Sequence, residues 1–485
     1  MTVYFENNSY KYETEAVMKL FCPLEGFEFV FDGKCDESGD HVLVSVTDRL
    51  IVSARLGGKT GHMEEPLCDE SDRELALCRM LYRVMSEITG VSPEWGCLTG
   101  IRPVKKVNAL INEGCSQDEV YERLCEKYFI SRRKSDLSYL TAVTQTPMLK
   151  SLDPKSFSLY IGIPFCPTRC SYCSFVSHSI RSRGATVLIP QYVEMLCREI
   201  TELGEMLKGK NTYCDTIYIG GGTPTSLSAE QIEKIMKTAE KSIDISHIRE
   251  YTVEAGRADS ITEDKLIAIR DNGATRISIN PQTMQDSVLR AIGRQHTAAQ
   301  FEECFNLARR LGFDNINTDT IAGLPTDTYE GFKDTIDRLI ALAPESITVH
   351  TLTVKRSAEL FKSAESFREG YLTDDSVSRM VNYAFDALTE NGLMPYYLYR
   401  QKNTVGNLEN VGYARAGKES LYNIYIMEET QNILACGASG STKLIDHSTG
   451  KITRFFNYKY PYEYISRYDK MMGYKPELEK FLAQL

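Results

Sequence analysis

Residues 158–175 read SLYIGIPFCPTRCSYCSF, and this stretch decides the expected fold. Its first half is a short apolar run that ends at a proline, which is typical of a buried strand. Three cysteines follow at once, Cys166, Cys170 and Cys173, with the spacing C-x3-C-x2-C. The pattern therefore predicts a strand that leads into a loop carrying three closely spaced thiols.

Three thiolates in one loop suit a cubic [4Fe–4S] cluster, because each can ligate one iron and leave the fourth iron open to another ligand. A structural zinc site is the alternative, since Cys170 and Cys173 alone have the C-x2-C spacing of zinc ligands. Zinc sites are usually completed by a second local pair, and here only His178 is a near candidate. The spacing favours the cluster, with Cys166, Cys170 and Cys173 as its ligands.

Five further apolar runs follow the first one, and segments of helical periodicity separate them. Strands that alternate with helices indicate parallel β/α units. Six units predict an α/β fold with a partial (β/α)6 barrel, whose ligand site lies at the carboxyl ends of the strands. The expected strands span residues 158–165, 215–221, 249–256, 274–280, 315–323 and 346–352.

The regions on either side of the barrel have other patterns. Residues 1–150 pass from short β-rich runs to helical periodicity, which predicts an N-terminal α+β accessory domain. Residues 151–355 form the expected barrel. Residues 356–485 contain a helical stretch, the aromatic run Pro395–Arg400 and further β-like pieces, and they predict a C-terminal α/β extension that closes the substrate side.

The composition and net charge of the chain limit the classes of function that it can have. The 485-residue chain has a formal net charge of −10, which argues against non-specific nucleic-acid binding. Because no apolar run is long enough to cross a bilayer and the N-terminus is polar, we expect a cytoplasmic protein without a membrane span. The 14 cysteines are scattered along the chain, so in a reducing compartment most should be free thiols.

The cysteine motif, with the aromatic Tyr172 before its last cysteine, resembles the signature of the radical S-adenosylmethionine (SAM) superfamily. The resemblance implies that SAM binds the open iron, takes up one electron and is cleaved to a 5′-deoxyadenosyl radical. It also implies that Gly221, Gly222 and Thr223, after the second strand, contact the amino group of the methionine part of SAM. Glycine lets backbone groups approach a ligand closely, and a tight turn is the alternative role of this segment.

Four later positions resemble the SAM-binding residues of the oxygen-independent coproporphyrinogen III oxidases, namely Glu254, Gln282, Arg294 and Asp319. A guanidinium suits the SAM carboxylate, and Asp and Gln suit ribose hydroxyls. Surface ion pairs or helix caps are the alternative roles of each residue taken alone. Tyr160 matches a tyrosine that precedes the cluster loop in these oxidases, where it either acts against the cluster and substrate as a catalytic residue or fills the barrel floor.

The resemblance covers about residues 155–445, and the segment Trp95–Pro103 is similar to the subgroup known as anaerobic coproporphyrinogen dehydrogenases. The implied reaction, in haem biosynthesis, is oxidative decarboxylation of two propionates of coproporphyrinogen III to vinyl groups. The implied redox partner is an electron donor such as flavodoxin or ferredoxin. A substrate with four carboxylates needs cations. Candidates for propionate contacts are Arg257, Arg276, Arg356, Arg400 and Arg415. A solvated surface charge is the alternative role of each of them.

Other functions stay open at this point. The best-characterised oxidases carry a fourth cysteine where this chain has Phe175, and the same phenylalanine occurs in a related branch of haem chaperones. The second hypothesis is therefore a haem chaperone with a radical SAM fold, although none of the seven histidines lies in an evident haem motif. An enzyme that modifies haem and a non-enzymatic zinc-binding protein are further alternatives.

Overall fold

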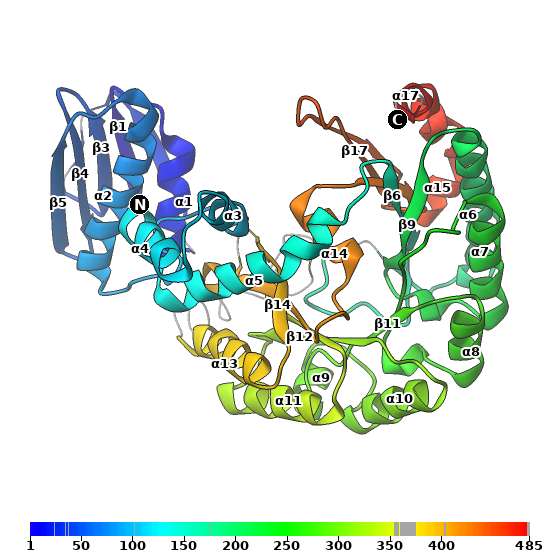
Figure 1. The fold of residues 1–485 in the computed structure, drawn as a ribbon. Coiled ribbons are helices and arrows are strands. Elements are labelled where there is room, and N and C mark those ends of the chain that lie inside the picture. Colours follow the sequence, from blue (N-terminus) through cyan, green and yellow to red (C-terminus); the bar gives the residue numbers. More distant parts are fainter. Residues whose placement is uncertain are drawn as a thin grey trace. The chain divides into compact units, whose positions relative to one another are not determined.

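The computed structural model describes residues 1–23, 25–33, 35–36, 38–100, 102–175, 177–353, 358, 375–401 and 404–482. The chain forms two compact units (Figure 1). Unit 1 comprises residues 1–140, 363–375 and 400–409, and unit 2 comprises residues 141–362, 376–399 and 410–485. Within the described ranges, no helix is long and apolar enough to span a membrane. The division into three domains made from the sequence stays a prediction.

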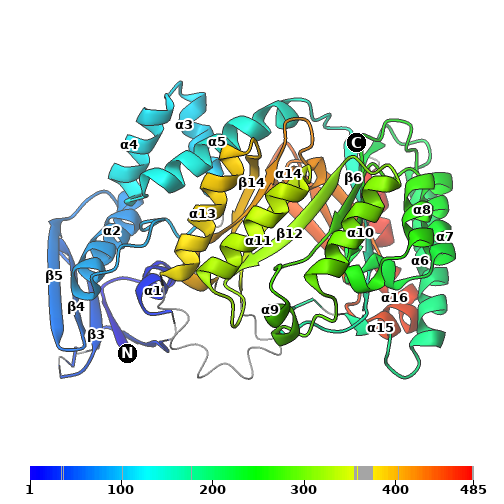
Figure 2. The ribbon, with the colours of Figure 1, turned by 90° about the horizontal axis from the view of Figure 1, so that it is seen from below.

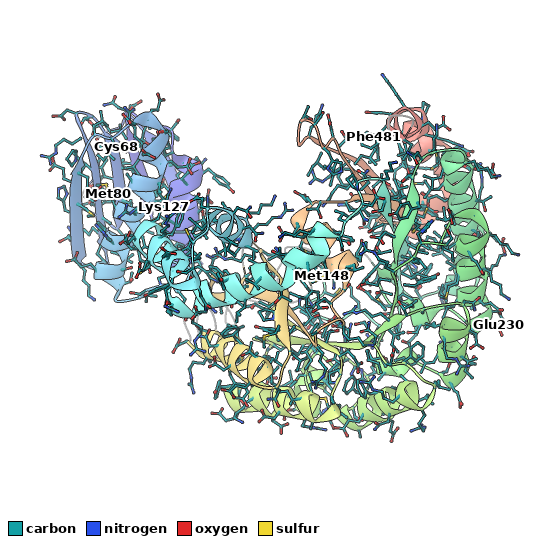
Figure 3. The ribbon with its side chains drawn as sticks, in the orientation of Figure 1. Cys68, Met80, Lys127, Met148, Glu230 and Phe481 are labelled. Atoms are coloured by element: carbon teal, nitrogen blue, oxygen red, sulfur yellow. The ribbon has the colours of Figure 1, made fainter. Side chains whose placement is uncertain are left out.

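Unit 1 contains a five-stranded sheet in the order β2-β1-β3-β4-β5. Strand β1 pairs in parallel with β2 and β3, and the remaining pairs are antiparallel. Helices α1 and α2 contribute to the core on this sheet, and buried Met80 of α2 lies within it (Figure 3). The bounds are β1 Thr2–Glu6, α1 Lys11–Phe21, β2 Glu28–Phe31, β3 His41–Val46, β4 Arg49–Leu56, β5 Lys59–Pro66, α2 Glu70–Thr89, α3 Val104–Asn112, α4 Gln117–Tyr128 and α5 Arg132–Lys150.

A buried polar cluster in unit 1 holds the segment that contains Trp95. The indole Nε1 of Trp95 donates to Glu409 Oε2 at 2.7 Å, and Lys134 Nζ lies 2.6 Å from Glu409 Oε1. The guanidinium of Arg400 lies 4.9 Å from the Trp95 ring and donates to the carbonyl of Leu98. Burial lowers the pKa of Arg400 to about 10. Because these groups satisfy one another, the cluster specifies the local structure of unit 1.

Unit 2 contains six parallel strands in sequence order, β6-β9-β10-β11-β12-β13, which confirms the predicted partial (β/α)6 barrel. The helices that follow the strands run along the outside of the sheet (Figure 1). Glu230 of α7 is exposed and points away from it (Figure 3). The bounds are β6 Ser156–Ile163, α6 Ala185–Leu207, β9 Tyr213–Gly221, α7 Ala229–Ser242, β10 Glu250–Gly256, α8 Glu263–Asp271, β11 Arg276–Ile279, α9 Asp286–Ala291, α10 Ala298–Arg310, β12 Ile316–Ala322, α11 Tyr329–Leu342 and β13 Ser346–Thr351.

The predicted C-terminal α/β extension continues the same sheet at both edges (Figure 2). Strand β15 pairs antiparallel with β13, and β14 follows it at that edge. At the other edge, β16 pairs in parallel with β6, and β17 and β18 follow as antiparallel strands. The bounds are α13 Ser376–Glu390, β14 Met394–Arg400, β15 Glu409–Ala414, α14 Leu421–Glu428, β16 Asn432–Cys436, β17 Ser441–Ile445, β18 Ile452–Phe456, α15 Pro461–Ser466, α16 Tyr468–Met471 and α17 Lys475–Leu482.

The buried carboxyl of Glu199, on α6, ties this extension to the barrel. It accepts hydrogen bonds from Gly437 N at 2.7 Å, Asn457 Nδ2 at 2.7 Å and Tyr464 Oη at 2.5 Å. Burial raises the pKa of Glu199 to about 7, against the opposing effect of these donors. The network therefore fixes the turn after β16 against the helix that follows the cysteine loop.

Candidate functional site

The loop that carries the three cysteines is folded back on itself beyond the end of β6. The short strands β7 (Phe165–Cys166) and β8 (His178–Ser179) pair in parallel, and Ile180 N donates to Cys166 O at 3.0 Å. The part of the loop between Cys170 and Cys173 is held by Ser171 N, which donates to Ile292 O at 3.1 Å. Backbone hydrogen bonds at both ends therefore give the loop a defined conformation.

Each cysteine sulfur has a polar neighbour that can donate a hydrogen bond to it. Thr223 Oγ1 donates to Cys166 Sγ at 3.5 Å, and Arg257 Nη1 lies 3.6 Å from Cys170 Sγ. Burial raises the pKa of Cys173 to about 11, and the backbone amide of Phe175 opposes that rise by donating to its sulfur. Hydrogen bonds to the charged form favour it, and thiolate is the form that binds iron.

The arrangement of these cysteines bears on the choice between zinc and a cluster. Among the described residues, no three His, Cys, Asp or Glu side chains lie close enough to share one metal ion. A zinc ion requires its ligands to converge on one point. In a [4Fe–4S] cluster each thiolate binds a different iron, so the sulfurs need not converge. Three thiols in one loop are the donor set of such a cluster.

The glycine-rich segment after β9 packs directly on the cysteine loop. Gly222 N donates to Ile163 O at 2.8 Å, and Thr223 N donates to Phe165 O at 2.7 Å. A Cβ atom on Gly222 would lie 2.6 Å from Phe165 O, so a side chain cannot be accommodated without a backbone shift. Gly221 has φ 110°, a conformation that favours glycine. Both glycines are thus required for the close approach of β9 to the loop.

The carboxyl of Glu254, at the end of β10, lies between Tyr218 and the glycine-rich segment. Tyr218 Oη donates to Glu254 Oε1 at 2.5 Å, and Gly221 N donates to Oε2 at 3.2 Å. Burial and the nearby Asp319 raise the pKa of Glu254 to about 7, while Tyr218, Gly221 and His350 oppose the rise. The ionisation of this carboxyl is therefore sensitive to the hydroxyl of Tyr218.

Gln282 and Asp319, which are far apart in sequence, are adjacent in the fold. Gln282 N donates to Asp319 O at 3.0 Å, and an isolated bridge pairs Gln282 with Thr320. Gln282 has φ 69°, which is unusual for a residue other than glycine. Its buried Oε1 has no hydrogen-bond partner among the described residues. A strained backbone that presents an unpaired amide oxygen indicates a ligand-binding position.

Arg294 connects the cysteine loop to β11. Its Nη1 donates to Asn280 O at 2.6 Å, and its Nη2 lies 3.4 Å from the hydroxyl of Tyr172. The buried Nε has no partner in the described structure. Nearby His296 is also buried, and burial together with Arg294 lowers its pKa to about 4. At neutral pH the neighbourhood of Arg294 therefore contains a neutral imidazole.

Tyr160 stacks with Tyr218 and Tyr422, which are not among the predicted site residues. Its ring centroid lies 6.3 Å from that of Tyr218 and 6.4 Å from that of Tyr422, and Tyr218 and Tyr422 are 4.5 Å apart. Tyr160 and Tyr218 are in register on β6 and β9, so they share one face of the sheet. His350 was also not selected, and its Nε2 lies 3.9 Å from Asp319 Oδ2. The period-two alternation of strand residues could have identified Tyr218 and His350.

The arginines proposed for propionate contacts occupy different environments. Arg276 is buried on β11, donates to Ser346 Oγ at 2.8 Å and keeps an Nε without a partner among the described residues. Arg257 is paired with Asp259 at 2.7 Å and lies against the cysteine loop. Arg400 belongs to the Trp95 cluster of unit 1, Arg415 is half-buried, and Arg356 lies outside the described residues.

Comparisons with known proteins extend these observations. Residues 160–339 match the model of the Radical SAM superfamily. The chain is 38% identical over 493 residues to the oxygen-independent coproporphyrinogen-III oxidase-like protein HemZ of Bacillus subtilis, with 96% of each chain covered. It is 30% identical over 285 residues to the heme chaperone HemW of Bacillus subtilis, with 58% of this chain and 70% of that protein covered.

A solved structure, the coproporphyrinogen III oxidase HemN of Escherichia coli, has a similar fold, with a TM-score of 0.52 and 23% identity over 69% of this chain and 72% of that one. The barrel fold, the cysteine loop and the match across 96% of a relative all indicate the same family. The chain belongs to the radical SAM superfamily and, within it, to the oxygen-independent coproporphyrinogen III oxidase-like proteins. Membership implies a [4Fe–4S] cluster and SAM. The donors at the cysteine sulfurs and the unpaired polar atoms of Gln282 and Arg294 fit these groups.

Proposed function

We propose that the protein catalyses the oxygen-independent oxidative decarboxylation of coproporphyrinogen III to protoporphyrinogen IX. The observation that carries the proposal is the 38% identity to HemZ, a coproporphyrinogen-III oxidase-like protein, over 96% of both chains. A match of that extent includes unit 1 as well as the barrel. The polar, aromatic face of the barrel supports the same substrate class.

In this proposal Cys166, Cys170 and Cys173 hold the cluster. SAM is held by residues on β9, β10 and β12 and on the segments that follow β9 and β11, namely Gly221, Gly222, Thr223, Glu254, Gln282, Arg294 and Asp319. When bound, the cluster and SAM would supply a 5′-deoxyadenosyl radical that can remove a hydrogen atom from a propionate side chain. The substrate radical then loses CO2 and passes one electron to an external acceptor, which leaves a vinyl group. The protein orients the substrate and excludes water from the reacting atoms.

The substrate would lie against the face of the sheet that contains Tyr160. A tetrapyrrole presents a broad apolar surface, and stacked aromatic rings provide large contact areas for such surfaces. Arg276 follows on the same face, because Thr252 is in register with both Tyr218 and Arg276. Its unpaired Nε can donate to a propionate carboxylate. Tyr160 is proposed as a catalytic residue that contacts the substrate.

The match to the heme chaperone HemW supports a second candidate function, delivery of haem, which needs no decarboxylation. To separate the two, the protein is reconstituted anaerobically with iron and sulfide and incubated with SAM, dithionite and coproporphyrinogen III. The oxidase proposal predicts 5′-deoxyadenosine together with a vinyl-containing product. Absence of both from a protein with a complete cluster would refute the oxidase, and tight haem binding by the same sample would then favour the chaperone.

Tyr218→Phe is expected to shift the pH dependence of SAM binding. If ionised Glu254 binds the amino group of SAM, affinity is retained above the pKa of that carboxyl and lost below it. The Tyr218 hydroxyl lowers this pKa, so its removal raises the pKa and moves the midpoint to higher pH. A hydrogen bond to a charged group contributes about 1.5–3 kcal/mol, which corresponds to about one pH unit or more. The dissociation constant of SAM is measured between about pH 6 and 9.

Tyr251→Phe is the matched control for this prediction. Tyr251, like Tyr218, lies on a barrel strand; it is buried, and its hydroxyl has no hydrogen-bond partner among the described residues. Removing that hydroxyl should leave the midpoint unchanged. Equal midpoints for Tyr218→Phe and the wild-type protein would mean that Glu254 does not govern SAM binding.

A further inference from the structure

The segment that carries the cysteines has an unusual charge. About one residue in seven of the chain is Asp or Glu, yet none occurs between Asp153 and Glu194. The same interval contains three arginines beyond the end of β6, namely Arg169, Arg181 and Arg183. A chain of net charge −10 thus keeps one segment free of acidic side chains.

These arginines are exposed together with two large apolar side chains. Arg169, Arg181 and Arg183 are all exposed, and 64% of Phe175 and 61% of Val187 is accessible to solvent. Arg181 and Arg183 make no ion pair with any residue that the structure describes. Exposed apolar groups on the same segment as exposed charges of one sign are characteristic of contact surfaces. We call these five residues the basic patch.

The basic patch lies directly on the cysteine loop. Phe175 N donates to the sulfur of Cys173, and Arg169 is close enough to lower the pKa of that thiol. Ser179, two residues before Arg181, is in register with Cys166, and its hydroxyl donates to Pro167 O at 3.1 Å. The segment that leads to Arg181 is therefore hydrogen-bonded to the loop that would hold the cluster.

We propose that the basic patch is the docking surface for an acidic one-electron carrier protein, which reduces the cluster. The inference rests on the proposed function, because it assumes that the cysteines hold a redox-active cluster. In the step, the carrier loses one electron and the cluster gains it, with no bond or proton transferred. Phe175 and Val187 supply the apolar contact, and the arginines attract and orient the carrier's acidic surface.

The size and sign of the patch favour this partner over other polyanions. Encounters between electron-transfer proteins use small interfaces, which a few exposed side chains can provide. Nucleic acid needs a basic surface of greater extent, and the net charge of −10 opposes its approach. At physiological ionic strength charges act over about 8 Å, so a local patch can attract a small acidic protein despite the overall charge.

The test compares the reconstituted wild-type protein with the double variant Arg181→Glu/Arg183→Glu, using an acidic flavodoxin as the probe. Arg169 is left unchanged because it lies between two of the cysteines. The expected result is a dissociation constant for flavodoxin that rises about tenfold or more at low salt, with the difference shrinking as salt screens the charges. Reduction of the cluster by flavodoxin hydroquinone should slow to a similar extent.

Lys241→Glu is the charge-reversal control, because exposed Lys241 lies at the end of α7, remote along the chain from the cysteine loop. Reduction and turnover with dithionite should be equal in all three proteins, since dithionite needs no docking surface. Unchanged flavodoxin binding in the double variant would refute the proposal, as would preferential binding of RNA, anionic vesicles or a second copy of the chain at this patch. Absence of both 5′-deoxyadenosine and a vinyl product with dithionite, from a protein with a complete cluster, would instead refute the proposed function.

Discussion

Replacing Cys170 by alanine is expected to give a folded protein that cannot hold a [4Fe–4S] cluster. Cys170 is almost fully buried, and its sulfur lies 3.6 Å from Arg257 Nη1. Its loss would leave two thiolates for three irons, and thiolates are the ligands that hold such clusters. Iron and sulfide content and iron–sulfur absorbance after anaerobic reconstitution should fall to near background. Alanine at Cys166 or Cys173 should have the same effect.

Cys197→Ala is the control that separates cluster loss from loss of a buried thiol. Cys170 and Cys197 are each 8% exposed, but Cys197 lies on α6, outside the loop. The two substitutions therefore remove the same buried group with different expected consequences. A Cys170→Ala protein that reconstitutes as fully as the Cys197→Ala protein would rule out Cys170 as a ligand.

The barrel could be predicted from sequence because its strands are buried on both faces. Such strands are read as short apolar runs, and each expected run overlaps a strand of the sheet, from β6 to β13. The positions of Glu254 on β10 and of Asp319 on β12 followed from the same pattern. Chain order alone then placed the cysteine loop and the glycine-rich segment at the same end of the sheet.

Contacts between distant segments could not be predicted in this way. Strand β16 lies next to β6, although more than two hundred residues separate them, and no periodicity encodes that pairing. The left-handed conformation of Gln282 depends on its bridge to Thr320. Arg400 was a candidate for a propionate contact, with a solvated surface charge as the alternative. Its guanidinium is instead buried, donates to Leu98 O and lies over Trp95. Leu98 and Trp95 belong to a segment about three hundred residues earlier in the chain.

Gly222→Ala should damage both stability and cluster binding, although the substitution adds one methyl group. The new Cβ would lie 2.6 Å from Phe165 O and 2.9 Å from Ile163 O, and these are backbone atoms that cannot rotate away. Overpacking of this kind costs about 1–3 kcal/mol. The backbone that must move leads directly into Cys166, so its thiolate would shift as well. Displaced supporting groups lower metal affinity by about 10- to 100-fold.

Thermal unfolding and iron content after reconstitution measure the two effects of Gly222→Ala separately, and Gly473→Ala is the control. A Cβ on Gly473 would meet nothing within 4 Å, and its φ lies outside the left-handed region, so alanine there should change neither quantity. A lower melting temperature with full iron content would mean that the contact supports only the fold. If both values stayed at wild-type level, the close packing of Gly222 on Phe165 would not control the position of Cys166. We expect both the melting temperature and the iron content to fall, because the backbone hydrogen bonds of Gly222 and Thr223 join the end of β9 to the cysteine loop.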